Sequence, residues 1–397
     1  MTAVEKSIFA EALTLPCGAV LKNRIAKPAM SDSLGDGRGT PTQQQIDLYR
    51  MWADGGLGLS IIGEVQGDPS VAEKPGNLVL RDGADAVQFR RLAESGAKNG
   101  AQLWLQLGHA GAMAHPPISV PRGPSALEVG AIVCRALTLD EVARIPSEFA
   151  RTATLAKELG FGGVQIHAAH GFLLSQFLSP LFNTRKDQYG GSIENRMRLI
   201  LEVISEVRHQ VGPEFPIGIK VNATDQLEGG LTEDDALKLI TALDETSVDL
   251  IDISGGTYFP GAKAASDAGG EGPYFLNFAR RARGLTSKPL MLTGGFKTHK
   301  QATDALSVGI DVVGLARALV LDPSLPNAWL AGETTAPSFP RFEDPPEGGV
   351  TAWYTMRMTE LAEGRGLSGP ERLSDAIRAY EERDATRVAI WNAHFGK

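Results

Sequence analysis

The sequence predicts an α/β protein built on a (β/α)8 barrel, with an N-terminal hairpin and a C-terminal helical extension. Eight short apolar runs alternate with stretches in which apolar residues recur at helical spacing. Each run is apolar throughout, which is typical of parallel strands covered on both faces. Eight such units favour closure into a barrel. An open, doubly wound sheet is the alternative, but no G-x-G-x-x-G follows a strand.

The expected elements follow one another in a regular order. A hairpin is expected around Pro16–Gly18, before the first strand. The eight strands are expected at residues 24–30, 58–63, 102–107, 163–167, 217–221, 250–253, 289–293 and 312–315. Helices are expected near residues 42–54, 83–98, 138–159, 194–210, 233–244, 274–283 and 298–308. Thr138 and Thr232 each precede an acidic residue by three positions, the spacing of a helix N-terminal cap.

The chain divides into a barrel over residues 1–333 and a tail over residues 334–397. Residues 334–349 are rich in Pro and Gly and are predicted to form a linker. Helical patterns follow at 352–364 and 373–380. This tail is too short for an independent domain, so it is expected to pack on the barrel or on a partner subunit. Its aromatic residues and methionines indicate a contact surface and a possible homo-oligomer.

Composition narrows the class of protein and the compartment. The net charge is −8 with both signs interspersed, which argues against nucleic acid or an anionic membrane as the main partner. No apolar run approaches about 18 residues, so no membrane span is expected. Residues 1–16 do not have the pattern of a signal peptide. Cys17 and Cys134 are isolated and form neither a disulfide framework nor a metal cluster. The default expectation is a cytoplasmic protein with a small-molecule substrate and no metal.

Two histidines mark the most informative segment of the chain. The strand at 163–167 delivers His167 and His170 into a polar loop of about two dozen residues, and compact domains keep such long loops mainly for binding or catalysis. The pair could bind a metal, although no third ligand lies at a recognised spacing. The rings could instead be structural. In the third interpretation, they clamp a carbonyl or nitro oxygen of a substrate and polarise it.

Other polar residues stand at the carboxyl ends of predicted strands, where barrel enzymes place their chemistry. Ser31 follows the first strand, Gln106 lies within the third, and Lys220 lies in the fifth. A buried Gln and Lys need polar partners, and together they could bind a polar heterocycle. A satisfied core amide for Gln106 and a surface position for Lys220 are equally open. Lys220 could also form a Schiff base, so an aldolase is an alternative class.

Glycine-rich turns follow the last two strands. Gly294 and Gly295 follow the seventh strand, and Ala316 and Arg317 follow the eighth. In (β/α)8 barrels these two loops commonly hold a phosphate through backbone N–H groups. Glycine permits the close backbone approach, and Arg317 would add a bidentate charge. The alternative is that these residues only form tight turns with a surface cation.

The segment HAAHGFLLSQFLSP, followed by N-x-R-x-D-x-YGGS-x-ENR, resembles the Old Yellow Enzyme family of FMN-dependent oxidoreductases. NRIAKPAMS, QLGHAG, PIGIKVN, TGGF and DVVGLARALVLDP agree in the same order, so the resemblance spans about residues 8 to 330. It implies a single FMN-containing barrel. It also implies hydride transfer from NADH or NADPH, through flavin N5, to an α,β-unsaturated carbonyl, a nitro compound or a quinone.

The resemblance also assigns roles to residues. Ser31 stands beside the flavin carbonyl edge, Gln106 at the pyrimidine portion and Lys220 near N1. The full set that it places around FMN is Pro28, Ala29, Met30, Ser31, Val65 (or Glu64), Gln106, His167, Lys220, Gly294, Gly295, Ala316 and Arg317. His167 and His170 are then the catalytic pair that holds the substrate oxygen. The polar residues of the long loop are expected to be scaffold.

One position departs from the family pattern. The family's proton donor is usually a Tyr two residues after the second histidine, and here that position is Phe172, whose ring has no proton to give. Phe172 and Tyr258 are expected to line the substrate side. The proton could come from water, Tyr258 or Tyr274. Alternatively, the chain catalyses a different redox reaction that needs no phenol.

Overall fold

Eight parallel strands close into a barrel in the computed structural model, which describes residues 7–260, 272–343, 345–346, 348–365 and 372–396. The barrel strands are β3 (Ile25–Met30), β4 (Leu59–Gln66), β6 (Gln102–Leu107), β10 (Gly163–Ala168), β11 (Ile217–Asn222), β12 (Leu250–Ser254), β13 (Leu290–Thr293) and β14 (Val312–Gly314). Closure comes from β14 pairing with β3 and β3 with β4, and the short β5 (Leu78–Val79) adds to β4. The predicted (β/α)8 barrel is confirmed, and the open sheet is excluded.

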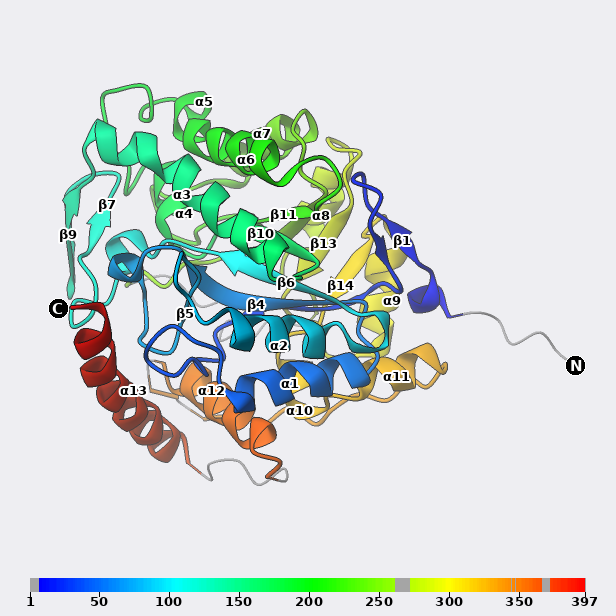
Figure 1. Ribbon diagram of the computed structural model, residues 1–397. Coiled ribbons are helices and arrows are strands. Elements are labelled where there is room, and N and C mark those ends of the chain that lie inside the picture. The colour runs from blue at the N-terminus through cyan, green and yellow to red at the C-terminus, as the bar shows by residue number, and fades with distance from the viewer. Residues whose placement is uncertain (1–6, 261–271, 344, 347, 366–371, 397) are drawn as a thin grey trace, which may run out of the picture.

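Helices surround the barrel on its outer face (Figure 1). The longer ones are α1 (Gln43–Asp54), α2 (Ala86–Gly96), α3 (Leu139–Glu158), α6 (Arg198–Val211), α7 (Glu233–Asp244), α8 (Leu276–Arg283) and α9 (His299–Ser307). Shorter ones are α4 (Leu173–Leu178), α5 (Ile193–Arg196), α10 (Arg317–Leu321) and α11 (Leu325–Leu330), with 3-10 turns η1 (Ile8–Ala10), η2 (Pro69–Val71), η3 (Lys98–Gly100) and η4 (Gly111–Met113). Thr138 forms the predicted capping box with Glu141, and Thr232 accepts from the Asp235 N–H.

At the end of the barrel that contacts the N-terminal hairpin, the interior is filled by apolar side chains. Trp104 is fully buried there, in one cluster with Leu15 and Leu21 of the N-terminal hairpin, which comprises β1 (Leu13–Thr14) and β2 (Val20–Leu21). Gly163 and Gly218 leave room for the indole, since a Cβ at these positions would lie 2.7 Å and 3.0 Å from its ring atoms. The hairpin therefore closes one end of the barrel, and polar chemistry is confined to the other.

The opposite end carries structure that the sequence did not predict. Within the stretch expected to be a loop, β7 (Arg122–Gly123), β8 (Leu127–Val129) and β9 (Ile132–Ala136) form a small sheet. The long loop after β10 contains α4, which begins directly after Phe172. In Figure 1 this sheet and the last helix lie at the end of the molecule opposite the hairpin.

The C-terminal extension folds onto the barrel of its own chain. It comprises α12 (Gly349–Ala362) and α13 (Leu373–Phe395), so the last helix continues well beyond the predicted end at residue 380. Arg387 donates to the Ser33 carbonyl, and Asn392 Nδ2 donates to the Pro117 carbonyl at 3.0 Å. Trp391 is buried against residues that follow β4 and β6. The extension thus spans the loops after β3, β4 and β6; a homo-oligomer formed through it stays a prediction.

Two searches of the described residues bear on partners. Among the helices with described coordinates, none combines the length and the apolar character that a bilayer crossing requires. Over the same residues, no group of three or more His, Cys, Asp or Glu side chains is arranged to share a metal ion. Residues 1–6, on which part of the signal-peptide prediction rests, and residues 261–271 lie outside the described ranges.

Candidate active site

A cavity of about 610 Å³ opens at the carboxyl ends of the later barrel strands. One side is lined by His170 and Tyr258, and the other by Gly294, Gly295 and Arg317. Its outer wall comes from the extension, through Phe339, Arg341, Phe342 and Tyr354. The volume lies in the range of small-molecule and cofactor sites. The segment predicted to be a plain linker therefore forms part of the site.

The two histidines stand side by side at the end of β10, with ring centroids 5.3 Å apart. His170 adopts a left-handed backbone conformation with φ of 60°, which is uncommon for a residue with a side chain. This conformation is held by two hydrogen bonds. The His170 N–H donates to Asn222 Oδ1 at 3.1 Å, and the Tyr258 N–H donates to the His170 carbonyl at 3.2 Å. The local strain aims the ring at the cavity.

Both imidazoles are neutral at physiological pH. Burial lowers the pKa of His170 to about 3, and the positive charge of Lys220 acts in the same direction. Burial, His170 and Lys220 hold the pKa of His167 well below its usual range. His170 Nε2 lies 2.9 Å from Ser254 Oγ, whereas His167 Nδ1 is buried without a hydrogen-bond partner among the described residues. A buried, unpaired ring nitrogen is costly and indicates a ligand atom.

Phe172 and Tyr258 flank the histidine pair. The Phe172 ring is buried 4.6 Å from the His167 ring. The Tyr258 ring lies 6.2 Å from Phe172 and 6.0 Å from His170, measured between centroids, and it is 56% exposed. Tyr274, the other phenol considered, lies instead against Gly294. Tyr258, and not Tyr274, therefore lies beside Phe172, the position at which the family usually has a proton-donating Tyr.

Lys220 and Gln106 belong to a buried polar network inside the barrel. Lys220 Nζ lies 3.1 Å from Asp252 Oδ2, and the two side chains are 1% and 0% exposed. Gln165 Nε2 donates to the same carboxylate at 3.1 Å, and Gln106 Nε2 donates to Gln165 Oε1 at 2.8 Å. Lys220 is therefore not a surface residue. Gln165 and Asp252 were not among the predicted site residues, although each interrupts an apolar strand just as Gln106 and Lys220 do.

A second buried lysine lies outside the cavity. Lys27 Nζ donates to the Tyr49 hydroxyl at 2.9 Å and to the Ile61 carbonyl at 2.8 Å, in the layer between the barrel and α1. Burial lowers its pKa to about 7. Lys27 thus has the lowered pKa that a Schiff-base lysine needs, but it does not line the cavity. Lys220 does not line the cavity either, and it is ion-paired with Asp252, which disfavours the aldolase alternative.

The carboxyl ends of the first two barrel strands, β3 and β4, lie near Ser31. Pro28 is buried, and Ala29 and Met30 are half-buried. Ser31 Oγ is buried without a hydrogen-bond partner in the described part of the chain. Val65 is fully buried in the core, so only its backbone could meet a flavin ring.

Glu64 lies next to this site in a left-handed conformation, with φ of 55°. Burial and the neighbouring Glu73 raise the pKa of its carboxyl group well above the usual range. Asn77 Nδ2 donates to Glu64 Oε2 at 3.3 Å. Burial and Glu73 thus favour the neutral form of this carboxyl group at the end of β4.

At the far side of the cavity, Gly294 and Gly295 form a glycine cradle beside Arg317, where the sequence predicts a phosphate site. Gly294 and Gly295 have φ of 113° and 83°, values open to glycine and strained for other residues. Arg317 begins α10, and its guanidinium lies 5.3 Å from the centre of the Tyr354 ring. The extension therefore positions the arginine that the sequence analysis assigned to a phosphate.

Over residues 15–332 the sequence matches the family of NADH:flavin oxidoreductases and NADH oxidases. The chain belongs to this family. Membership confirms the resemblance to Old Yellow Enzyme proteins and makes the chain a flavin-dependent oxidoreductase. It also confirms FMN and a reduced nicotinamide as the expected cofactors.

Named relatives lie at about one-third identity. The NADH-dependent flavin oxidoreductase nadA of Aspergillus parasiticus is 35% identical over 337 residues, covering 78% of this chain and 76% of that protein. The NADH-dependent flavin oxidoreductase iliE of Neonectria sp. is 33% identical over 379 residues, covering 86% of this chain and 49% of that protein. The chain thus spans about half the length of that relative. An Old Yellow Enzyme homologue from Zymomonas mobilis shares the fold, with a TM-score of 0.72 at 23% identity over 88% of this chain and 98% of that one.

The residues present fit the flavin that this NADH:flavin oxidoreductase requires. The glycine cradle and Arg317 can receive a phosphate, and the unpaired Ser31 Oγ and His167 Nδ1 lie at strand ends where a polar ring system would meet them. Gln106 and Lys220 offer further polar groups from the barrel interior. The assignment of individual residues to FMN stays a prediction, which binding measurements on variants can test.

Arg317→Ala is expected to weaken FMN binding by roughly 10- to 100-fold, because a hydrogen bond to a charged phosphate contributes about 1.5–3 kcal/mol. Titration of the apoprotein, followed by quenching of flavin fluorescence, measures the dissociation constant. Riboflavin lacks the phosphate, so its affinity should be the same for the variant and the wild type. Arg317→Lys should retain part of the FMN affinity. Equal losses for FMN and riboflavin would place Arg317 elsewhere.

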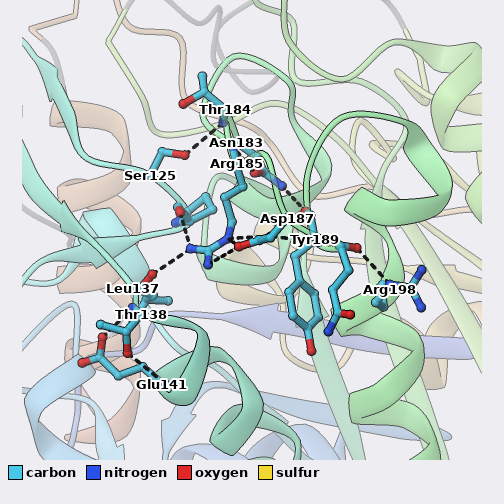
Figure 2. Close-up of polar contacts among 12 residues, drawn as sticks. Ser125, Leu137, Thr138, Glu141, Asn183, Thr184, Arg185, Asp187, Tyr189 and Arg198 are labelled. Atoms are coloured by element: carbon cyan, nitrogen blue, oxygen red, sulfur yellow. Dashed lines mark hydrogen bonds and ion pairs between the residues drawn. The ribbon is translucent and has the colours of Figure 1, made fainter.

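The polar residues of the long loop form a latch rather than a binding surface (Figure 2). Arg185 binds the Asp187 carboxylate through Nε and Nη2, and its Nη1 donates to the Pro124 carbonyl at 2.8 Å and the Leu137 carbonyl at 2.7 Å. Asn183 Nδ2 donates to the Tyr189 carbonyl at 2.7 Å. The latch ties the loop after β10 to the sheet of β7 and β9, as the scaffold interpretation predicts.

Proposed function

We propose that the chain is an NADH-dependent FMN oxidoreductase that reduces an α,β-unsaturated carbonyl or a related electron-poor acceptor, such as a nitro compound or a quinone. The observation that carries this proposal is the pair of neutral imidazoles at the end of β10: His170 lines the cavity, and His167 is buried beside it with an unpaired ring nitrogen. Such a pair suits an oxygen on which negative charge develops. NADH rather than NADPH is proposed because the relatives at about one-third identity are named NADH-dependent.

The side chains divide the work between binding and polarisation. Bound FMN supplies hydride chemistry between the nicotinamide and the acceptor. His167 and His170 donate N–H hydrogen bonds to the acceptor oxygen and hold the molecule in one orientation. Because both rings are neutral, they can polarise this oxygen without placing a full charge in the cavity. Lys220 favours the neutral form of both rings, because its positive charge acts against their protonation.

The proton that completes alkene reduction must come from a group other than residue 172. Tyr258 is the best placed phenol, because its ring stands beside both Phe172 and His170. Its exposure lets it exchange protons with solvent. We therefore propose Tyr258, or water that enters beside it, as the proton source.

A second candidate function follows from the same position. A redox reaction that needs no phenol, such as quinone or nitro reduction, would be compatible with Phe172 as it stands.

The decisive experiment is a spectrum of the purified protein followed by anaerobic mixing with NADH or NADPH. A flavin oxidoreductase should carry or take up FMN and lose its visible absorption when the preferred nicotinamide is added. A panel of enones, nitro compounds and quinones then identifies the acceptor class. Failure to bind FMN, even after reconstitution, would refute the proposal.

Phe172→Tyr is expected to leave FMN affinity unchanged and to raise enone reduction, because it restores a phenol 4.6 Å from the His167 ring. Proton transfer by a positioned side chain contributes about 10²–10⁴-fold, so a gain of tenfold or more would show that proton supply limits the native enzyme. Quinone reduction in the same variant is the internal control and should not rise. An unchanged enone rate would show that the proton is already supplied from elsewhere.

A further inference from the structure

A single carboxylate organises the polar interior of the barrel. Asp252 is fully buried on β12 and accepts a hydrogen bond from Thr293 Oγ1 at 2.7 Å and from Gln165 Nε2 at 3.1 Å. Lys220 Nζ lies 3.1 Å from Asp252 Oδ2 and is the third polar partner of this carboxylate. In the strand register, Lys220 is the neighbour of Asp252 on one side and of His167 on the other. The carboxylate on β12 is therefore separated from His167 of the catalytic pair, on β10, by the single strand β11 that carries Lys220.

The charge of Asp252 fixes the orientation of two amides. An ionised carboxylate can only accept hydrogen bonds, so Gln165 must turn its NH2 group toward Asp252. Its oxygen then faces Gln106, and Gln106 must in turn donate its NH2 group, as the 2.8 Å contact shows. This order leaves the carbonyl oxygen of Gln106 as the group free for a ligand. Asp252 thus sets the orientation of the Gln106 amide, which is predicted to bind the flavin, through one intermediate residue, Gln165.

Asp252 also offsets the charge of Lys220. A buried ion pair has little net charge at a distance, whereas an unpaired buried ammonium would create a strong local field. Two-electron reduction adds negative charge to a flavin, which a nearby cation stabilises and a nearby anion opposes. The effect of Lys220 on a bound flavin therefore depends on whether its partner is charged.

We propose that Asp252 is a positioning residue for the flavin: it holds the Lys220 ammonium and, through Gln165, the amide of Gln106. Its negative charge keeps the reduction potential of bound FMN below the value that Lys220 alone would give. This inference rests on the proposed function only in requiring that FMN binds over these residues. It does not depend on the acceptor or on the source of the proton.

The test is the midpoint potential of the FMN-loaded protein, measured by anaerobic reduction against a reference dye. Asp252→Asn keeps the shape of the side chain and removes the charge, so its potential should shift to a more positive value. Lys220→Met leaves Asp252 unopposed, so its potential should shift to a more negative value. Thr293→Val removes only a neutral hydrogen bond to the same carboxylate and should give a much smaller shift. A potential equal to that of the wild type in Asp252→Asn, or in Lys220→Met should the first variant not fold, would overturn the inference.

Gln165→Leu separates the amide relay from the charge effect. This variant keeps the Lys220–Asp252 pair but frees Gln106, so FMN affinity should fall roughly tenfold while the potential stays near that of the wild type. Unchanged FMN affinity would refute the relay. These measurements use no acceptor, so they separate this inference from the proposed function. A wild-type protein that binds no FMN would refute the proposed function. Unshifted potentials in FMN-loaded variants would refute only the role of Asp252.

Discussion

The double substitution His167→Ala and His170→Ala is expected to lower enone turnover by roughly 10²–10³-fold, the effect of removing a donor to a developing oxyanion. His170 lines the cavity, His167 is buried beside it and both rings are neutral, so their loss is expected to remove hydrogen bonds to the acceptor without changing the net charge of the site. Steady-state turnover of a simple cyclic enone, with NADH as the donor, measures the effect. The content of bound FMN, read from its absorption, should stay near that of the wild type.

Two controls separate binding from polarisation in the double variant. His209→Ala, at an exposed position near the end of α6, removes an imidazole far from the cavity and should leave turnover unchanged. Reduction of FMN by NADH, followed without an acceptor, reports whether the nicotinamide still binds. Near-normal enone turnover in a double variant that retains FMN would show that the histidines do not hold the acceptor oxygen.

Arg185→Ala is expected to reduce the free energy of unfolding by about 3 kcal/mol, because it leaves a charged partner and two carbonyls without their donor. The guanidinium binds the Asp187 carboxylate and the carbonyls of Pro124 and Leu137, and its side chain is 9% exposed. Urea denaturation measures the loss. Arg198→Ala is a matched control in the same segment: Arg198 donates through Nε to the Gln188 carbonyl at 2.9 Å, and its loss should cost less than about 1 kcal/mol.

The Arg185 substitution also predicts a change in pH dependence. The Arg185 guanidinium holds the pKa of Asp187 below its usual range. The resulting stabilisation is present above the ordinary carboxyl pKa and is lost as the pH falls through the lowered one. The wild type should therefore lose this contribution in acid, whereas Arg185→Ala should already lack it at neutral pH. Equal stability losses at neutral and strongly acidic pH would contradict the assignment.

The barrel was predictable from the sequence because parallel strands that are buried on both faces appear in it as continuous apolar runs. The observed strand ends differ from those expected by three residues at most, and the largest difference is at the end of β4. The predicted last helix ends at residue 380, whereas the observed one continues to Phe395. Its buried residues are only Ala376, Asp384 and Trp391, too few to give a helical pattern of apolar residues in the sequence. The small sheet of β7–β9 was missed because its strands are two to five residues long and bury only Gly123 and Cys134.

The site was predictable one residue at a time but not as a network. Gln106 and Lys220 stand out as polar residues in apolar strands, and so do Gln165 and Asp252. What the sequence lacks is the register, which pairs Gln165 with Gln106 and Lys220 with Asp252 across neighbouring strands. The contribution of Phe339, Arg341 and Phe342 to the cavity wall was also hidden, because a Pro- and Gly-rich segment shows no periodicity that would assign it to a site.

The placement of the extension has a consequence for the order in which the protein matures. The residues expected around the flavin ring are complete once β14 has been synthesised, but the outer cavity wall and the helix that spans the loops come from later residues. During translation the ribosome holds those later residues back, so the nascent barrel has a wider entrance than the finished one. The outer wall of the cavity is therefore the last part of the site to be synthesised.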